Sequence, residues 1–186
     1  MSDLIFANSA ISAHMATYGL NQPRIHALIR AKTQEQINIL LQELGNENAY
    51  QKFMEYCDDP ALKICVKAIH EFKTRKSDSV AKSEKQLLSV IEKSIDKIKY
   101  DKAREYFVTY SEAFKVNKKI PESRLFKIAR DMRYDNTTIG PIFYWYVLKQ
   151  AESTAVKTIL MGKQAGFEND EILQNLKGLG LYERFE

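Results

Sequence analysis

The sequence contains few of the residues that build tight turns, disulfide frameworks or membrane spans. Its 186 residues include seven glycines, four prolines and two cysteines, Cys57 and Cys65. A β-sandwich needs many tight turns and usually contains more glycine and proline, and two cysteines cannot form a disulfide framework. No stretch approaches the ~18 to 20 apolar residues that a membrane span needs. We therefore expect a soluble protein outside the all-β and disulfide-rich classes.

A secretory signal is also missing. Met1-Ser2-Asp3-Leu4 contains no basic n-region, and no long apolar h-region follows it. We therefore expect a cytoplasmic protein, and this expectation is compatible with a peripheral position on a membrane complex.

Motifs for catalysis are absent as well. The sequence has no glycine-rich phosphate loop of the Walker or dinucleotide type and no Gly-x-Ser-x-Gly elbow. His14, His26 and His70 are scattered without the spacing of metal ligands. Cys57 and Cys65 fall on apolar helix faces, where we favour a core position over zinc binding. The sequence predicts no enzyme activity, no metal site, no cofactor and no small-molecule substrate.

Apolar residues recur at helical spacing from one end of the chain to the other. Lys, Glu, Gln, Ala, Leu and Ile dominate the long segments, and these residues favour helix. The pattern predicts an all-α fold, an irregular bundle of about nine or ten helices. We expect one helical domain over residues 1–186, and the charged stretch near 73–82 is the candidate for an exposed boundary.

Several helix ends carry specific signals. Thr33 and Gln36 fit a capping box for a helix that ends at Gly45. A longer helix is expected over about 79–99, and Pro121 opens a later one. In the last part of the chain, single glycines are interpreted as helix punctuation: Gly162, Gly166, Gly178 and Gly180.

The chain is mildly basic, with a formal net charge of +4, and its basic residues gather in the region 115–133. Arg124, Lys127 and Arg130 lie there at three-residue spacing. Such cations neutralise phosphates in nucleic-acid complexes, or they form a solvated helix face, which is the alternative we favour. The aromatic residues nearby follow helical spacing and are expected in the core.

The run Phe143-Tyr144-Trp145-Tyr146 is apolar on nearly every side of its predicted helix. A helix of this kind is buried, either within its own fold or against a partner. We favour burial within the domain over an interface with a partner.

The tail of the chain resembles a known family. Residues 141–152, Pro-Ile-Phe-Tyr-Trp-Tyr-Val-Leu-Lys-Gln-Ala-Glu, are similar to the aromatic-aliphatic helix ending in glutamate near the C-terminus of the C-subunit family of V-type and A-type ATPases, which is the family of the vacuolar d-subunit. Residues 156–167 resemble that family's helix ending in Gly-Lys-x-x-Gly-aliphatic. Glu171-Ile172, followed by Leu176, matches its closing Glu-x-Ile-x-x-x-Leu helix.

The head of the chain is compatible with the same family. Arg24-Ile25-His26-Ala27-Leu28, followed by Leu40-Leu41, is similar to the family's N-terminal Ala-Arg-x-x-x-Leu and Leu-Leu pattern.

The resemblance implies a helical socket that links the rotating central stalk of a rotary ATPase to the membrane-embedded ion-carrying ring. Its partners would be the stalk and ring proteins, and it would perform no chemistry. Carried over by position, the polar residues of the tail motif are Glu152, Lys157 and Lys163. The family usually has arginine where Lys157 stands, and lysine lacks the planar fork for bidentate pairing. Family members are about twice as long and form three similar helical lobes, so this chain would be a shortened or divergent member.

The sequence therefore supports two hypotheses of function. The leading hypothesis is a non-catalytic coupling subunit of a V/A-type rotary ATPase. The alternative is a small helical adaptor that binds nucleic acid or a regulatory protein through the basic region 115–133 and its cations Arg124, Lys127 and Arg130.

Overall fold

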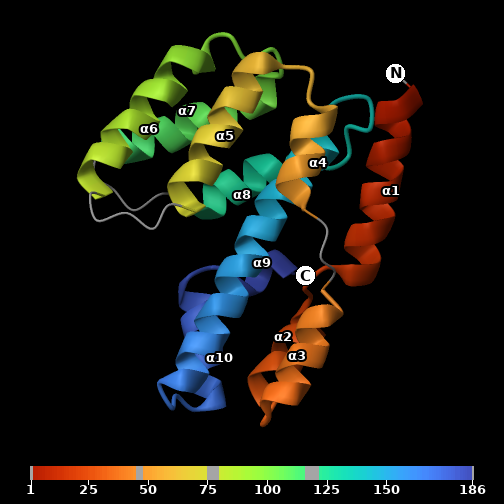
Figure 1. The fold of residues 1–186 in the computed structure, drawn as a ribbon, viewed down its shortest axis with the longest axis vertical. Coiled ribbons are helices and arrows are strands. Elements are labelled where there is room, and N and C mark those ends of the chain that lie inside the picture. Colours follow the sequence, from red (N-terminus) through yellow and green to blue (C-terminus); the bar gives the residue numbers. More distant parts are fainter. Residues whose placement is uncertain (1, 45–47, 75–79, 116–121, 186) are drawn as a thin grey trace. The chain divides into compact units, whose positions relative to one another are not determined.

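The structure is a computed structural model of the chain, and it describes residues 2–44, 48–74, 80–115 and 122–185. These residues form ten α-helices and one short 3₁₀ helix, and they contain no strand (Figure 1). The predicted all-α class and the predicted number of helices are confirmed. The elements are α1 (Ser2–Tyr18), α2 (Gln22–Arg30), α3 (Gln34–Gln42), α4 (Ala49–Tyr56), α5 (Pro60–Thr74), α6 (Val80–Ile95), α7 (Asp101–Lys115), α8 (Glu122–Asp131), α9 (Gly140–Gln164), α10 (Asn169–Gly178) and η1 (Tyr182–Phe185).

The helix starts in the first part of the chain follow the local signals. Asn21 is the N-cap of α2, and its side chain accepts a hydrogen bond from the Arg24 N–H at 2.9 Å. The capping box of α3 forms as predicted between Thr33 and Gln36. These side chains satisfy N–H groups that have no partner within a helix's first turn.

Helix α6 is shorter than the sequence predicts, because it ends at Ile95 rather than near residue 99. Two tight turns close it, from the Lys97 N–H to the Ser94 carbonyl and from the Ile98 N–H to the Ile95 carbonyl. Ile98 is still fully buried, as its apolar side chain predicts.

Helix α9 joins two segments that the sequence suggests as separate helices, and it runs without a break for 25 residues. Gly162 therefore lies inside a helix instead of ending one. A Cβ at Gly162 would come to 2.8 Å from Cγ1 of Ile172, so the close approach of α10 accounts for glycine at this position. The helix ends at Gln164, and a Schellman motif follows it, in which Gly166 has φ 77° and the Phe167 N–H donates to the Gly162 carbonyl.

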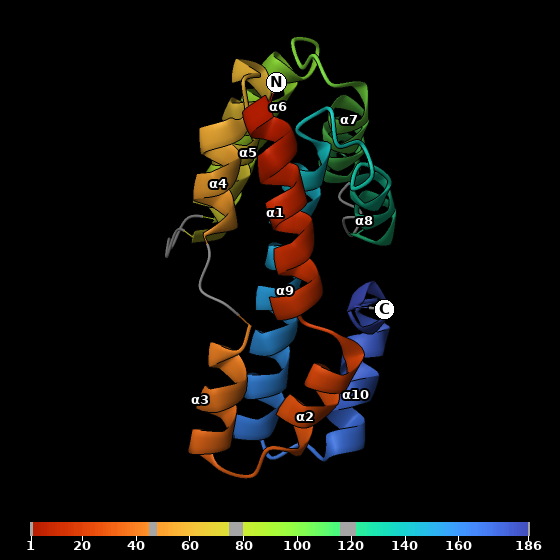
Figure 2. The ribbon, with the colours of Figure 1, turned by 90° about the vertical axis from the view of Figure 1, so that its right-hand side faces the viewer.

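The contacts divide the chain into two compact units. Unit 1 consists of Met1–Ala49 and Trp145–Glu186, and unit 2 consists of Tyr50–Tyr144. Within unit 1, α10 packs against α2 and η1, and α2 packs against α3. Figures 1 and 2 show the later part of α9 lying among α2, α3 and α10.

Unit 2 is built from consecutive helices. Helix α5 packs against α6, α6 against α7, and α7 against α8. Its core is aromatic: the Phe143 ring lies 5.9 Å from that of Phe53 and 5.1 Å from that of Tyr106, in edge-to-face arrangements. Cys57 and Cys65 are buried in this unit, which confirms their predicted place in the core.

Some predictions concern residues outside the described ranges. The helix end at Gly45, the helix start at Pro121 and residues 75–79 of the predicted boundary belong to this group. The single-domain organisation stays a prediction.

Candidate functional site

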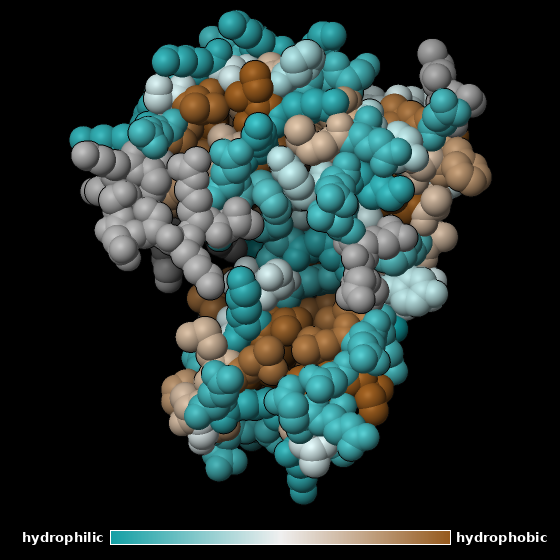
Figure 3. Space-filling view, viewed as in Figure 1, coloured by the Kyte–Doolittle hydropathy of each residue, from teal (hydrophilic) through white to brown (hydrophobic). Residues whose placement is uncertain are grey.

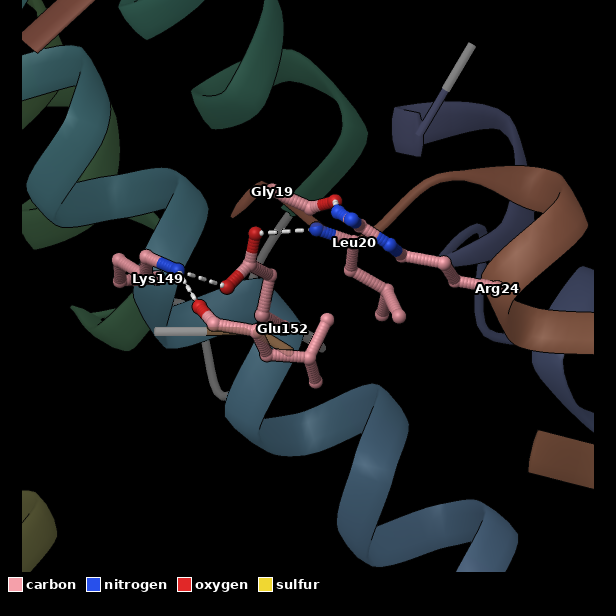
Figure 4. A network of polar contacts seen from close by, with 6 residues as sticks. Gly19, Leu20, Arg24, Lys149 and Glu152 are labelled. Carbon is pink, nitrogen blue, oxygen red and sulfur yellow. Dashed lines mark hydrogen bonds and ion pairs between the residues drawn. The ribbon is translucent and has the colours of Figure 1, made fainter. Parts of the chain in front are cut away.

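The most distinctive polar arrangement lies in unit 1, around a buried carboxylate on α9. Glu152 is only 4 % exposed. Its Oε1 accepts a hydrogen bond from the backbone N–H of Leu20 at 2.8 Å, and the two residues are 132 positions apart in the sequence (Figure 4). The tail helix thereby binds the segment that leads from α1 into α2.

Lys149 completes this contact from one helical turn earlier on α9. Its Nζ lies 2.7 Å from Oε2 of Glu152, in an ion pair whose side chains are 15 % and 6 % exposed. The same Nζ donates to the carbonyl of Leu44 at 3.1 Å. One ammonium group therefore neutralises the buried carboxylate and also binds the chain just after α3.

Arg24 supports the same connection from the side of α2. Its guanidinium donates to the Gly19 carbonyl at 2.6 Å (Figure 4). It also donates to the Thr17 carbonyl at 3.0 Å. These carbonyls belong to the end of α1 and the residue after it, where no later helical N–H satisfies them. The turn that presents the Leu20 N–H to Glu152 is thus fixed on both sides.

A second contact lies three turns further along α9. Lys163 Nζ donates to the carbonyl of Ile29 at 2.5 Å and to that of Ala31 at 2.7 Å. Both carbonyls lie at the end of α2, where a cation satisfies free acceptors and interacts favourably with the helix dipole. Lys163 therefore ties the C-terminal end of α9 to the C-terminal end of α2.

These contacts share one physical pattern, in which a charged side chain binds backbone groups at helix ends. Hydrogen bonds to charged groups contribute about 1.5 to 3 kcal/mol each. A buried ion pair adds little to the stability of a fold compared with an apolar pair. Removing only one partner of a fully buried pair, however, lowers the stability by about 3 to 5 kcal/mol. These contacts therefore favour one particular way of packing residues 17–44 against α9.

The six residues predicted to bind partners fall into two groups. Glu152 and Lys163 are engaged in the contacts within unit 1 described above. Lys157 is exposed on α9. The side chains of Arg124, Lys127 and Arg130, on α8 of unit 2, are also exposed.

Sequence reasoning missed two members of the site, Lys149 and Arg24. Lys149 precedes Glu152 by three residues, which is the spacing of a helical charge pair. That spacing was a usable signal, since a lysine in an otherwise apolar helix needs a partner. Arg24 stands in the head motif, but no local pattern indicates that it reaches back to Gly19.

The thiols of unit 2 are poorly suited to chemistry. Burial raises the pKa of the Cys57 thiol to about 11 and that of Cys65 to about 12, so both are protonated near neutral pH. Within the described ranges, no three His, Cys, Asp or Glu side chains gather where they could hold a metal ion.

Unit 1 also carries an apolar surface. Figure 3 shows apolar side chains gathered between α9 and α3, with hydrophilic residues around them. On these two helices, Ile39 is 52 % exposed and Met161 is 68 % exposed. A shallow groove of about 360 Å³ lies between α2 and α3 and is lined by Ala27, Arg30, Ala31, Gln36, Ile39 and Leu40.

None of the described helices combines the length and apolar character that a membrane crossing needs. In comparisons with protein-family models, curated proteins and solved structures, no match to this chain was found.

Proposed function

We propose that this chain is a non-catalytic coupling subunit of a V/A-type rotary ATPase, which links the central stalk to the membrane ring. The observation that carries the proposal is the composition of unit 1. The two segments that resemble the C-subunit family are the head around Arg24 and the tail from residue 141. The head and most of the tail belong to one compact unit although they lie far apart in the sequence.

The polar residues of the tail motif support this proposal. Glu152 binds the Leu20 N–H and Lys163 binds the carbonyls of Ile29 and Ala31, so both act on the head segment. A protein that passes torque needs its parts to move together. Charged side chains that fix helix ends supply such rigidity, because buried polar contacts have few alternative arrangements.

A coupling protein also needs surfaces for partners. The apolar surface between α9 and α3 is of the kind that marks protein interfaces. Lys157 is exposed on α9 and, in the proposed role, would contact a partner as a single cation, since it cannot form the bidentate pairs of arginine.

The proposal can be tested in membranes of the organism that encodes the chain. In a strain lacking it, we expect ATP hydrolysis by the rotary ATPase to generate little membrane potential in inverted vesicles, measured with a potential-sensitive dye that responds to any transported ion. The wild-type chain should restore the potential and should co-purify with stalk and ring proteins.

Two exposed lysines of unit 1 provide a matched pair of variants. Lys157→Glu should weaken co-purification several-fold, whereas Lys32→Glu should not, and both should unfold at the wild-type temperature because neither side chain is buried. An unchanged membrane potential in the deletion strain, with the chain absent from the purified ATPase, would show that the proposal is wrong.

A further inference from the structure

Helix α8 of unit 2 has an unusually one-sided distribution of charge. Its buried face is apolar, with Leu125, Ile128 and Ala129 among the buried residues. Among the residues from Ser123 onward, whose side chains the structure describes, the exposed ones are Ser123, Arg124, Lys127, Arg130 and Asp131. Three of these five are cations.

The three cations of α8 have no counterion within the part of the chain that the structure describes. Ion pairs are found elsewhere in the same unit, such as Arg104 with Asp101 at 3.1 Å and Lys115 with Glu92 at 3.0 Å. Among the described residues, no such pair involves Arg124, Lys127 or Arg130, although Asp131 is exposed on the same face.

The exposed faces of the neighbouring helices are mixed in sign. On α6, exposed Glu92 precedes exposed Lys93. On α7, exposed Lys102 lies next to Asp101 and near Glu105. Mixed charges of this kind are enough to keep a surface solvated. The row of cations on α8, formed by Arg124, Lys127 and Arg130, is instead suited to an acidic partner.

The spacing of these three cations matches the spacing of carboxylates on an acidic helix. Three residues along an α-helix correspond to a rise of about 4.5 Å, so the α8 cations follow one another at about that interval. Carboxylates three or four residues apart on a partner helix have nearly the same spacing. Arginine also binds a carboxylate through two parallel hydrogen bonds.

Asp131 argues against a polyanion such as nucleic acid. It lies four residues after Lys127 and is exposed on the same face. The Asp131 carboxylate would repel the phosphates of a nucleic acid, which are all negatively charged. A protein helix, in contrast, can place a basic residue opposite Asp131. Nucleic-acid surfaces also use denser positive charge than three side chains.

We propose that the exposed face of α8 is a docking surface for an acidic α-helix of a partner protein, whose carboxylates pair with Arg124, Lys127 and Arg130. This surface lies in unit 2, and the proposal does not depend on the rotary assembly. It would hold for any partner that offers such a helix.

The experiment uses the full chain and two synthetic helical peptides labelled with a fluorophore. The row peptide carries three glutamates on one face, followed by a lysine to meet Asp131. The scattered peptide has the same composition with its glutamates distributed around the helix. By fluorescence anisotropy at low salt, we expect the row peptide to bind about tenfold more tightly, since three exposed pairs together suffice for that factor.

Matched variants identify the surface. The triple variant Arg124→Gln, Lys127→Gln, Arg130→Gln should lose about tenfold in affinity for the row peptide. The triple variant Lys93→Gln, Lys97→Gln, Lys102→Gln changes the charge equally at exposed positions and should stay within about twofold. Circular dichroism checks that both variants keep the wild-type helix content.

Three results would overturn the proposal. The first is equal binding of the two peptides, and the second is an equal effect of the two triple variants. The third is tighter binding of duplex DNA, or of vesicles containing phosphatidylserine, than of the row peptide, which would assign the face to a polyanion. None of these results depends on whether the chain joins a rotary ATPase.

Discussion

Unit 1 and unit 2 are held together by different kinds of contact. Unit 2 is a continuous stretch of chain, Tyr50–Tyr144, and consecutive helices pack around aromatic rings such as Phe107 and Phe143. Unit 1 combines the first 49 residues with the last 42, and charged side chains on α9 bind backbone groups of the head.

This difference affects how each unit responds to damage. The helices of unit 2 pack mostly against the next helix in the sequence, so we expect loss of one ring to weaken the core without changing which helices meet. Unit 1 must close a long loop before the contacts between its head and its tail form. Its specific contacts to α9 involve few side chains, so we expect single polar substitutions to matter more there.

The largest effect is expected from the core of unit 2. Phe107 is fully buried on α7, and Phe107→Ala should lower the free energy of unfolding by about 3 to 5 kcal/mol. The measurement is urea unfolding followed by circular dichroism. Phe107→Leu should lower the free energy of unfolding by clearly less, because it leaves a smaller cavity. Equal losses for the two variants would show that the packing of the Phe107 ring does not set this stability.

A smaller loss is expected when a charged contact of unit 1 is removed. Lys163→Met keeps the apolar stem but loses the bonds to the Ile29 and Ala31 carbonyls, and it should cost about 1 to 3 kcal/mol. Lys157→Met, on the exposed side of the same helix, should change stability by less than about 0.5 kcal/mol. If the two variants unfold at the same urea concentration, Lys163 does not hold α2.

Two helical glycines should respond with opposite signs. Gly162→Ala places a Cβ 2.8 Å from Cγ1 of Ile172, and the strain should outweigh the gain in helix propensity by about 1 kcal/mol. Gly178→Ala meets nothing within 4 Å and should stabilise the chain by about 0.5 to 1 kcal/mol. Thermal unfolding compares the two, and stabilisation by Gly162→Ala would rule out the close approach of α10.

The smallest effect concerns pH and unit 2. The His70 ring stacks on Tyr50 at 3.8 Å, and burial lowers the pKa of His70, while the Glu71 carboxylate opposes the shift. The unfolded chain therefore binds a proton more readily, so this residue contributes stability above about pH 6.5 that is lost as pH falls through the lowered pKa. His70→Phe should make stability less dependent on pH between about 7 and 5. An identical pH dependence in both proteins would contradict this.

Much of the fold follows from local patterns in the sequence. The capping box at Thr33 and Gln36, the Pro60 start of α5 and the buried stripe of α7 depend on neighbours within one or two turns. The end of α6 at Ile95 could not be predicted this way. The backbone after it is held by distant groups: the Asp59 carboxylate accepts from the Lys99 N–H at 2.7 Å.

The candidate site was only partly predictable for the same reason. The tail motif picks out Glu152 and Lys163, but their partners are backbone groups more than 130 positions away, which carry no side-chain signal. Gly162 illustrates the limit. Its role depends on the closeness of Ile172 in three dimensions, and from sequence it looks like a helix stop.

The most direct test of the account is amide hydrogen exchange on the wild-type chain and on Glu152→Ala. The substitution leaves the partly buried Lys149 ammonium without its counterion and the Leu20 N–H without its acceptor, which should cost about 2 to 3 kcal/mol. We predict that amides of α2, α3 and α10 lose protection while those of α5, α6 and α7 keep it, and that exposed Glu105→Ala changes neither set. An equal loss of protection in both units, or no loss in unit 1, would contradict the claim that Glu152 ties the head of the chain to its tail.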